Sequence, residues 1–146
     1  MDLSWQFSYI DILIVMAAIL LIAVFLYVRK ILIRARGEHL DTKFIKEEWK
    51  KINELLDYGQ EMNYKLAVIE ADKLLDFVMK ASYFQGLTMA DRLRFGSYRF
   101  PELKKVWWAH KVRNLVVHEA RYNLKHGEAK KVLELFGNAL KALGAL

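Results

Sequence analysis

Hydrophobic residues form one long uninterrupted run near the start of the chain. Every residue from Ile12 to Val28 is apolar or aromatic, and Ile31, Leu32 and Ile33 resume the run after two cations. At about 1.5 Å per residue, such a run lies at the short end of what crosses a bilayer. The stems of Arg29 and Lys30 can extend the apolar surface. We therefore predict a transmembrane helix over residues 12–33.

A cleaved signal peptide and a buried core helix are the alternatives to a span. A signal peptide needs cations before the apolar run and a small-residue cleavage site after it. The first eleven residues carry Asp2 and Asp11 and no cation, and no clear site follows the run. Trp5, Tyr9 and Tyr27 occupy positions typical of interfacial aromatics. The pattern favours an uncleaved single-pass span.

The charges that flank the run predict its orientation. Arg29, Lys30, Arg34 and Arg36 follow the run, whereas only acids precede it. By the positive-inside rule, the tail (residues 1–11) lies outside the cell membrane. The juxtamembrane linker (34–40) and the following domain (41–146) lie in the cytoplasm.

Beyond the span, apolar residues recur at helical spacing, and no stretch alternates as a strand would. A helix capped by Asp41 or Thr42 ends at Tyr58-Gly59, and a second runs from about Glu61 to Ala81 and is stopped by Gly86. Thr88 and Asp91 resemble a capping box that opens a short segment, which Gly96-Ser97 breaks. Pro101 suits the first turn of the next helix, and His126-Gly127 forms the turn before the last. The expected core residues are Ile45, Trp49, Ile52 and Leu56, then Leu66, Ile69, Leu74, Phe77 and Val78, and finally Ala129, Val132, Leu133, Phe136, Leu140 and Leu143.

This pattern predicts an all-α fold, with an N-terminal transmembrane helix followed by a cytoplasmic bundle of four to five helices. About 105 residues are enough for one hydrophobic core. The chain has no cysteine, so disulfides and thiol chemistry are excluded. Its net charge of +6 indicates an anionic partner, either nucleic acid or lipid head groups.

The helix after Pro101 concentrates the candidate chemistry. On a helical wheel, its polar residues fall within an arc of about 140°. Trp108, Ala109, Val112, Leu115, Val116 and Ala120 cover the opposite side, as a core stripe would. Val117 interrupts the polar arc, which suits a helix pressed against a partner. Glu119 points into the apolar side unless the helix has already ended there. The polar arc consists of His110, Arg113, Asn114, His118 and Arg121.

Cations and aromatic rings alternate along and before this helix. Between Arg92 and Arg113 there are seven cations and one acid, Glu102, with five aromatic residues among them. Cations that neutralise phosphates beside rings that stack on bases are typical of single-stranded RNA grooves. Alternatively, the rings belong to the core and the cations face solvent or anionic lipid. The predicted RNA-binding residues are Arg92, Arg94, Arg99, Lys104, Lys105, His110 and Lys111.

Other chemistries find no support in the sequence. The four histidines form no HxxxH or HExxH pair, so we expect no metal site. No serine lies in a nucleophile elbow, and no glycine-rich phosphate loop is present, so we expect no cofactor.

The segment Arg113-Asn114-Leu115-Val116-Val117-His118 resembles the Arg-x4-6-His motif of the HEPN superfamily, in which a polar residue often follows the arginine. Arg34 to His39 and Arg121 to His126 match the bare spacing too. Arg113 is favoured because Asn114 adjoins it and because it lies on an amphipathic helix. The resemblance covers residues 39–143 and not the span.

The resemblance implies a metal-independent endoribonuclease that acts as a homodimer, with two motifs facing across a shared cleft. Arg113, Asn114 and His118 are then the catalytic residues. A histidine near neutral pKa moves the proton of the 2′-OH, and an arginine stabilises the phosphorane. We expect an acid of the second bundle helix (Glu70, Asp72 or Asp76) to pair with Arg113 or Lys111, which would also suit a purely structural role. The alternatives are a non-catalytic module that binds RNA, nucleotide or protein at the membrane, and an anchored scaffold whose cations face lipid.

Overall fold

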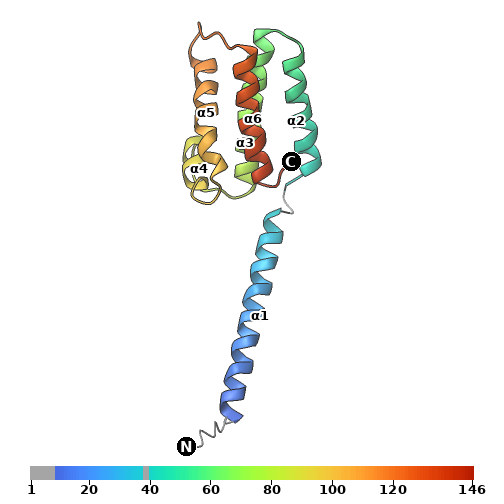
Figure 1. The fold of residues 1–146 in the computed structure, drawn as a ribbon, viewed down its shortest axis with the longest axis vertical. Helices are drawn as coiled ribbons and strands as arrows, with labels where there is room; N and C mark the ends of the chain where they lie inside the picture. The colour runs from blue at the N-terminus through green and yellow to red at the C-terminus, as the bar shows by residue number, and fades with distance from the viewer. Residues whose placement is uncertain (1–8, 38–39) are drawn as a thin grey trace, which may run out of the picture. The chain divides into compact units, whose positions relative to one another are not determined.

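The computed structural model describes residues 9–37 and 40–146, and for Ile10 and residues 29–37 it describes the backbone only. Most of the predicted tail, including Trp5, and His39 of one alternative motif lie outside the described residues. The described residues form six helices and no strand (Figure 1). The chain divides into two compact units, residues 1–38 and 39–146. The prediction of an all-α fold is confirmed.

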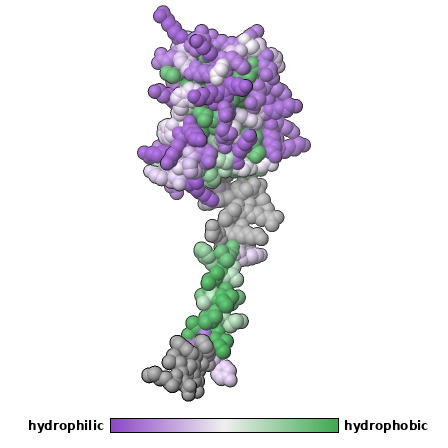
Figure 2. All heavy atoms as spheres, in the orientation of Figure 1, coloured by the Kyte–Doolittle hydropathy of each residue, from purple (hydrophilic) through white to green (hydrophobic). Residues whose placement is uncertain are grey.

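The first unit contains one helix, α1 (Tyr9–Gly37). Its segment Asp11–Val28 has a mean hydropathy of 2.8, and none of it is buried within the protein. Figure 2 shows this apolar surface in green, in contrast to the mostly hydrophilic surface of the bundle. The helix is therefore long and apolar enough to cross a membrane. It continues through residues 34–37, which the charge pattern assigned to the linker.

The second unit begins with α2 (Thr42–Asp57) and α3 (Glu61–Ala81). The Asp41 side chain caps α2 by accepting a hydrogen bond of 3.0 Å from the backbone N–H of Phe44. The predicted range of α3, from about Glu61 to Ala81, is confirmed, although Gly86 is not the residue that ends the helix. Two hydrogen bonds form a Schellman motif at its end, from Phe84 N–H to Met79 O and from Tyr83 N–H to Lys80 O. Tyr83 adopts the left-handed conformation that this motif requires (φ 58°).

The remaining helices are α4 (Met89–Gly96), α5 (Glu102–His118) and α6 (His126–Ala142). The predicted capping box opens α4, where Thr88 and Asp91 exchange hydrogen bonds of 3.1 Å. The predicted turn at His126-Gly127 is wrong, because both residues lie in the first turn of α6. Residues 119–125 form the connection instead. Because Glu119 is extended (φ −105°, ψ 101°), it ends α5 and never enters the core.

The helix α3 lies at the centre of the bundle and packs against α2, α5 and α6. Its core residues are mostly small or aliphatic, so three neighbours can approach it closely. Leu66 and Phe77, which the spacing assigned to the core, are 43% and 47% exposed. Ala67 takes the inward position beside Leu66, and Val78, which the spacing also assigned to the core, is buried beside Phe77. The fully buried residues of α3 are Ala67, Val68, Ala71, Leu75, Val78 and Met79.

The bundle has two distinct ends (Figure 1). At the first, called the α4 end below, the start of α2 meets the end of α3, with the Phe44 and Phe77 rings 6.1 Å apart. The start of α5 joins the same end, since Phe100 lies 5.8 Å from Phe84. The opposite end, called the His118 end, contains the end of α5 and the starts of α3 and α6. There the ring centroids of Tyr64 and His126 lie 5.3 Å apart.

Two helical glycines predict stability changes of opposite sign. A Cβ on Gly96 would lie 2.7 Å from side-chain carbons of Leu103 and Phe84, and Leu103 is fully buried. Gly96→Ala should therefore lower the free energy of unfolding by about 1–3 kcal/mol. A Cβ on Gly127 would meet nothing within 4 Å, so Gly127→Ala should raise it by up to about 1 kcal/mol. Denaturant unfolding of residues 39–146 measures both changes. If the two substitutions changed the free energy of unfolding in the same direction, the packing around these glycines would differ from that in the structure.

Candidate functional site

The buried face of α5 differs from the one that the helical wheel predicted. Its core residues, Leu103, Val106, Ala109 and Val112, recur every third position. Because a helix turns every 3.6 residues, this row drifts around the axis and carries part of the polar arc inward. Trp108 was predicted in the core but is 39% exposed. The Nζ atom of Lys131 lies 5.1 Å from its ring centroid.

Asp72 of α3 is the acid that meets the inward part of this arc. It is 3% exposed, and its Oδ1 lies 2.7 Å from Nδ1 of His110. An ionised carboxylate only accepts, so Nδ1 of His110 carries the hydrogen when Asp72 is ionised. The other oxygen, Oδ2, lies 3.3 Å from Nε of Arg113, as an ion pair without hydrogen-bond geometry. The expected pairing of Arg113 with an acid of the second bundle helix is confirmed, and Asp72 is that acid.

Arg113 also contacts its neighbour in the motif. One terminal nitrogen of its guanidinium donates a 3.0 Å hydrogen bond to Oδ1 of Asn114. The guanidinium is thus held from two sides, by a buried carboxylate and by an amide, and its side chain is 26% exposed. His118 is the last residue of α5, one turn after Asn114, and it is exposed. The motif thus supplies a fixed arginine and an exposed imidazole within five residues of one helix, and both groups suit chemistry on a phosphodiester.

The outward side of α5 carries a continuous stripe, called the α5 stripe below. Its residues are spaced 3, 4, 3 and 4 apart, which keeps them on one face of a helix. Asn114 is half-buried and the other four are exposed, including Trp107 at 41%. From first to last the stripe is about 21 Å long. It consists of Lys104, Trp107, Lys111, Asn114 and His118.

Two of the predicted RNA-binding residues point into the protein. His110 faces Asp72, as described above. Arg92 is 4% exposed, and its guanidinium donates 2.8 Å and 2.7 Å hydrogen bonds to Oδ1 of Asp76 and to the Gly86 carbonyl. Lys80 binds the second oxygen of Asp76 from outside, at 2.6 Å. Because the donors of its guanidinium are engaged inside the bundle, Arg92 does not belong to a surface that could contact RNA.

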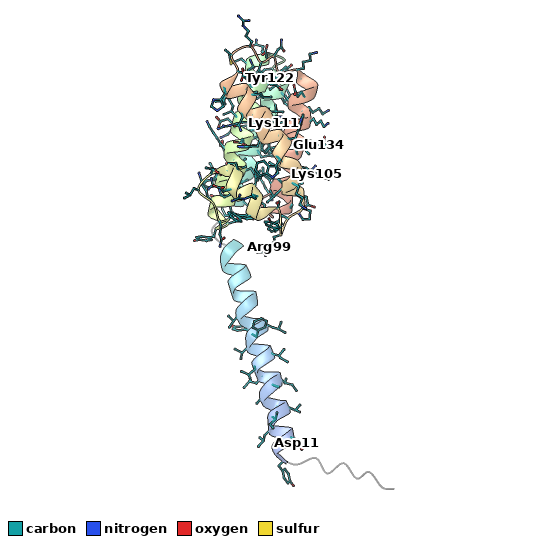
Figure 3. The ribbon with its side chains drawn as sticks, turned by 90° about the vertical axis from the view of Figure 1, so that its left-hand side faces the viewer. Asp11, Arg99, Lys105, Lys111, Tyr122 and Glu134 are labelled. Carbon is teal, nitrogen blue, oxygen red and sulfur yellow. The ribbon has the colours of Figure 1, made fainter. Side chains whose placement is uncertain are left out.

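The other predicted RNA-binding residues are exposed but do not form one patch. Lys104 and Lys111 belong to the α5 stripe, whereas Lys105 lines a groove of about 410 Å³ against α6. Arg94 and Arg99 lie at the α4 end, over the rings of Phe95 and Phe100 at 4.9 Å and 5.3 Å. Figure 3 shows Arg99 at one end of the bundle, Tyr122 at the other, and Lys105 and Lys111 between them. Since α5 alone is about 25 Å long, Arg99 and His118 cannot contact the same nucleotide.

Tyr122, in the loop after α5, does not serve as a second base beside His118. The Tyr122 hydroxyl donates a 2.7 Å hydrogen bond to Glu128. Burial, followed by this bond, raises the pKa of Tyr122 to about 12. The phenol is therefore neutral near pH 7 and suits a structural role, fastening the loop to α6. Within the described part of the chain, no group of three or more acidic or histidine side chains is placed to hold a metal.

Sequence reasoning did not include Trp107 among the site residues, although its position was readable. It was treated only as one of several rings among cations. Its spacing from Lys104 and Lys111 gives the signal, because three and four residues separate positions on one helical face. Burial in the structure then shows that this face is the one open to solvent.

Comparison of the chain with protein-family models, with curated proteins and with solved structures finds no match.

Proposed function

We propose that this protein is a membrane-anchored, HEPN-like endoribonuclease that acts without a metal and as a homodimer. In this proposal α1 spans the cell membrane once, the N-terminus lies outside, and the bundle lies in the cytoplasm. The observation that carries the proposal is the α5 stripe. It places two lysines, a tryptophan, an amide and an imidazole on one exposed helical face, and Arg113 is hydrogen-bonded to the amide of Asn114.

Each residue of this face has a role in cleaving RNA. Lys104 and Lys111 neutralise successive phosphates, and a base stacks on Trp107. His118 removes the proton of a 2′-OH, whose oxygen attacks the adjacent phosphorus and displaces the 5′-oxygen of the next nucleotide. Arg113 stabilises the charge of the phosphorane. The products are a 2′,3′-cyclic phosphate and a 5′-hydroxyl, with the departing oxygen taking up a proton.

A second copy of the chain completes the site in this proposal. One stripe offers a single exposed imidazole, whereas this cleavage benefits from one group that removes a proton and another that returns one. Val117, beside His118, is 46% exposed and supplies apolar contact area. A shared bilayer would raise the effective concentration of one domain near another.

The second candidate function is a non-catalytic module that binds RNA, nucleotide or a protein at the membrane. One observation favours it specifically. Arg113 is engaged by Asp72, which is 3% exposed. An ion pair at that depth can be retained for the fold even where no reaction occurs.

The deciding experiment uses the bundle, residues 39–146, because its core lies within residues 45–145. The purified bundle is incubated with mixed RNA in EDTA, and its mass is measured by light scattering. We expect cleavage that leaves cyclic phosphate ends, and a dimeric mass. Bound but intact RNA would favour the binding module. RNA that is neither bound nor cleaved would overturn both the ribonuclease and the RNA-binding form of the module.

The lysines of the stripe predict a salt dependence that can be measured separately. Replacing Lys104 and Lys111 by Gln removes two phosphate contacts. The slope of log affinity for single-stranded RNA against log salt should then become shallower by about 1.4. Lys130→Gln with Lys141→Gln, on α6, is the matched control and should leave the slope unchanged. Equal changes in both pairs would show that binding follows total charge and not the stripe.

A further inference from the structure

The α4 end of the bundle carries a group of exposed apolar side chains, called the α4-end patch below. Leu87 is 96% exposed, and Tyr98 is 84% exposed. Tyr83 and Phe95 are 65% and 43% exposed. The segment that holds them is short and continuous, from the end of α3 to the loop before α5. A leucine almost fully in water gains free energy from any apolar surface that covers it.

The charges around this patch are mainly positive. Arg94 and Arg99 are exposed and lie over the rings of Phe95 and Phe100. From residue 83 to residue 99 there is one acid, Asp91. Its carboxylate is held in the capping box of α4, and the hydrogen bonds from Thr88 lower its pKa. The surface therefore suits an anionic partner that also offers apolar contact.

Tyr83 gives a second reason to consider this end a contact surface. The C-terminal position of a Schellman motif is usually glycine, because a left-handed conformation is unfavourable for any residue with a Cβ. Here a tyrosine adopts it, with φ 58°, and its side chain is largely exposed. A residue held in an unfavourable conformation is typical of sites where its side chain has a use.

The sequence also limits how far this end can lie from the end of α1. Residues 38–41 are all that separates Gly37 from Thr42, the first residue of α2. Five Cα–Cα steps extend over at most about 18 Å. The start of α2 belongs to the α4 end of the bundle, where Phe44 contacts Phe77. If α1 spans a membrane, the α4 end is therefore within reach of the lipid head groups.

We propose that the α4-end patch docks on the anionic surface of the bilayer that α1 crosses. Leu87 and Phe95 enter the boundary between head groups and acyl chains, and the rings of Tyr83 and Tyr98 lie at head-group level. Arg94 and Arg99 bind lipid phosphates. Because the His118 end is opposite, docking directs His118 away from the membrane and leaves the α5 stripe open to solvent.

The first test measures binding of the bundle, residues 39–146, to vesicles by flotation. Vesicles of phosphatidylcholine with about one third phosphatidylserine are compared with pure phosphatidylcholine. We expect binding to the anionic vesicles only. Each basic residue near such a surface is worth about fivefold in partitioning, so Arg94→Gln with Arg99→Gln should weaken it about 25-fold. Leu87→Ser should weaken it about tenfold.

Matched variants separate docking from general charge attraction. Lys125→Gln with Lys130→Gln removes the same charge near the His118 end, and Met62→Ser removes an exposed apolar side chain (72% exposed) near the same end. Both should bind vesicles as the unchanged bundle does. Equal loss in the Lys125 and Lys130 pair, or equal binding to neutral vesicles, would overturn the proposal. Loss of RNA binding instead of vesicle binding in the arginine pair would assign these arginines to RNA.

The second test uses the full chain, which contains no cysteine. A polarity-sensitive fluorophore is attached at Leu87→Cys or at Met62→Cys, and each protein is placed in bilayer nanodiscs with anionic lipid. The reference for each position is the bundle, residues 39–146, labelled at the same position and measured in buffer. Relative to this reference, emission from position 87 should shift to the blue, while emission from position 62 should not. Equal emission at both positions would contradict docking, whether or not the protein cleaves RNA.

Discussion

His118→Ala is expected to lower the rate of RNA cleavage by the bundle about 10²–10⁴-fold. This is the range that general acid–base catalysis by one positioned side chain contributes. His118 is the last residue of α5, is exposed and does not belong to the core. The free energy of unfolding should therefore change by less than about 1 kcal/mol. Cleavage is followed in EDTA with labelled RNA, and unfolding is followed by circular dichroism.

The chain supplies its own matched control for this variant. Arg121 and His126 repeat the Arg-x4-His spacing at the same end of the bundle, but Arg121 lies in the loop and His126 begins α6. Arg121→Ala with His126→Ala should leave cleavage within about threefold of the unchanged bundle. His118 is a cleaner test than Arg113, whose loss would leave buried Asp72 without one of its partners. Unchanged cleavage in His118→Ala would end the catalytic proposal.

Asp76→Ala is expected to lower the free energy of unfolding of the bundle by about 3–5 kcal/mol. Without Asp76, the Arg92 guanidinium keeps only the Gly86 carbonyl as a partner, although Arg92 is 4% exposed. Removing one member of a buried ion pair leaves an uncompensated charge, and its cost falls in this range. Small domains are stable by about 5–15 kcal/mol in total, so the variant should melt far below the unchanged protein.

Two further variants distinguish the buried charge from a general loss of contacts. Lys80 binds the same carboxylate from outside with a side chain that is 60% exposed. Lys80→Gln should cost less than about 1 kcal/mol, as exposed pairs do. Replacing both Asp76 and Arg92 by Leu and Met should recover much of the lost stability, because no unpaired charge remains. A double variant as unstable as Asp76→Ala would show that packing, and not charge, dominates at this position.

The periodicity of apolar residues was enough to predict the helices of the bundle, because each of them buries a face that recurs at helical spacing, whereas α1 followed from its uninterrupted apolar run. The boundaries of α2 and α3 followed from local signals, such as the Asp41 cap and the Tyr58-Gly59 turn. The capping box of α4 was equally local. The turn predicted at His126-Gly127 was wrong because glycine often marks a turn. Gly127 instead lies in the first turn of α6, where it is tolerated and a Cβ would meet no neighbour.

The candidate site was predictable only in part. The motif residues Arg113, Asn114 and His118 could be named from their order in the chain. A single wheel could not decide which side of α5 faces inward, because its core residues recur every third position and the face drifts. The same limit explains Trp108, which was predicted in the core and lies outside it.

The sequence by itself determined that this protein is helical and that one helix near its N-terminus is apolar enough to cross a membrane, since both depend on periodicity and run length. It also narrowed the partner of Arg113 to three acids of one helix. Only the tertiary structure selected Asp72 and separated the seven candidate cations into buried pairs, the α5 stripe, the groove against α6 and the α4 end. These distinctions depend on which helices pack together, and that is decided by contacts between residues far apart in the chain.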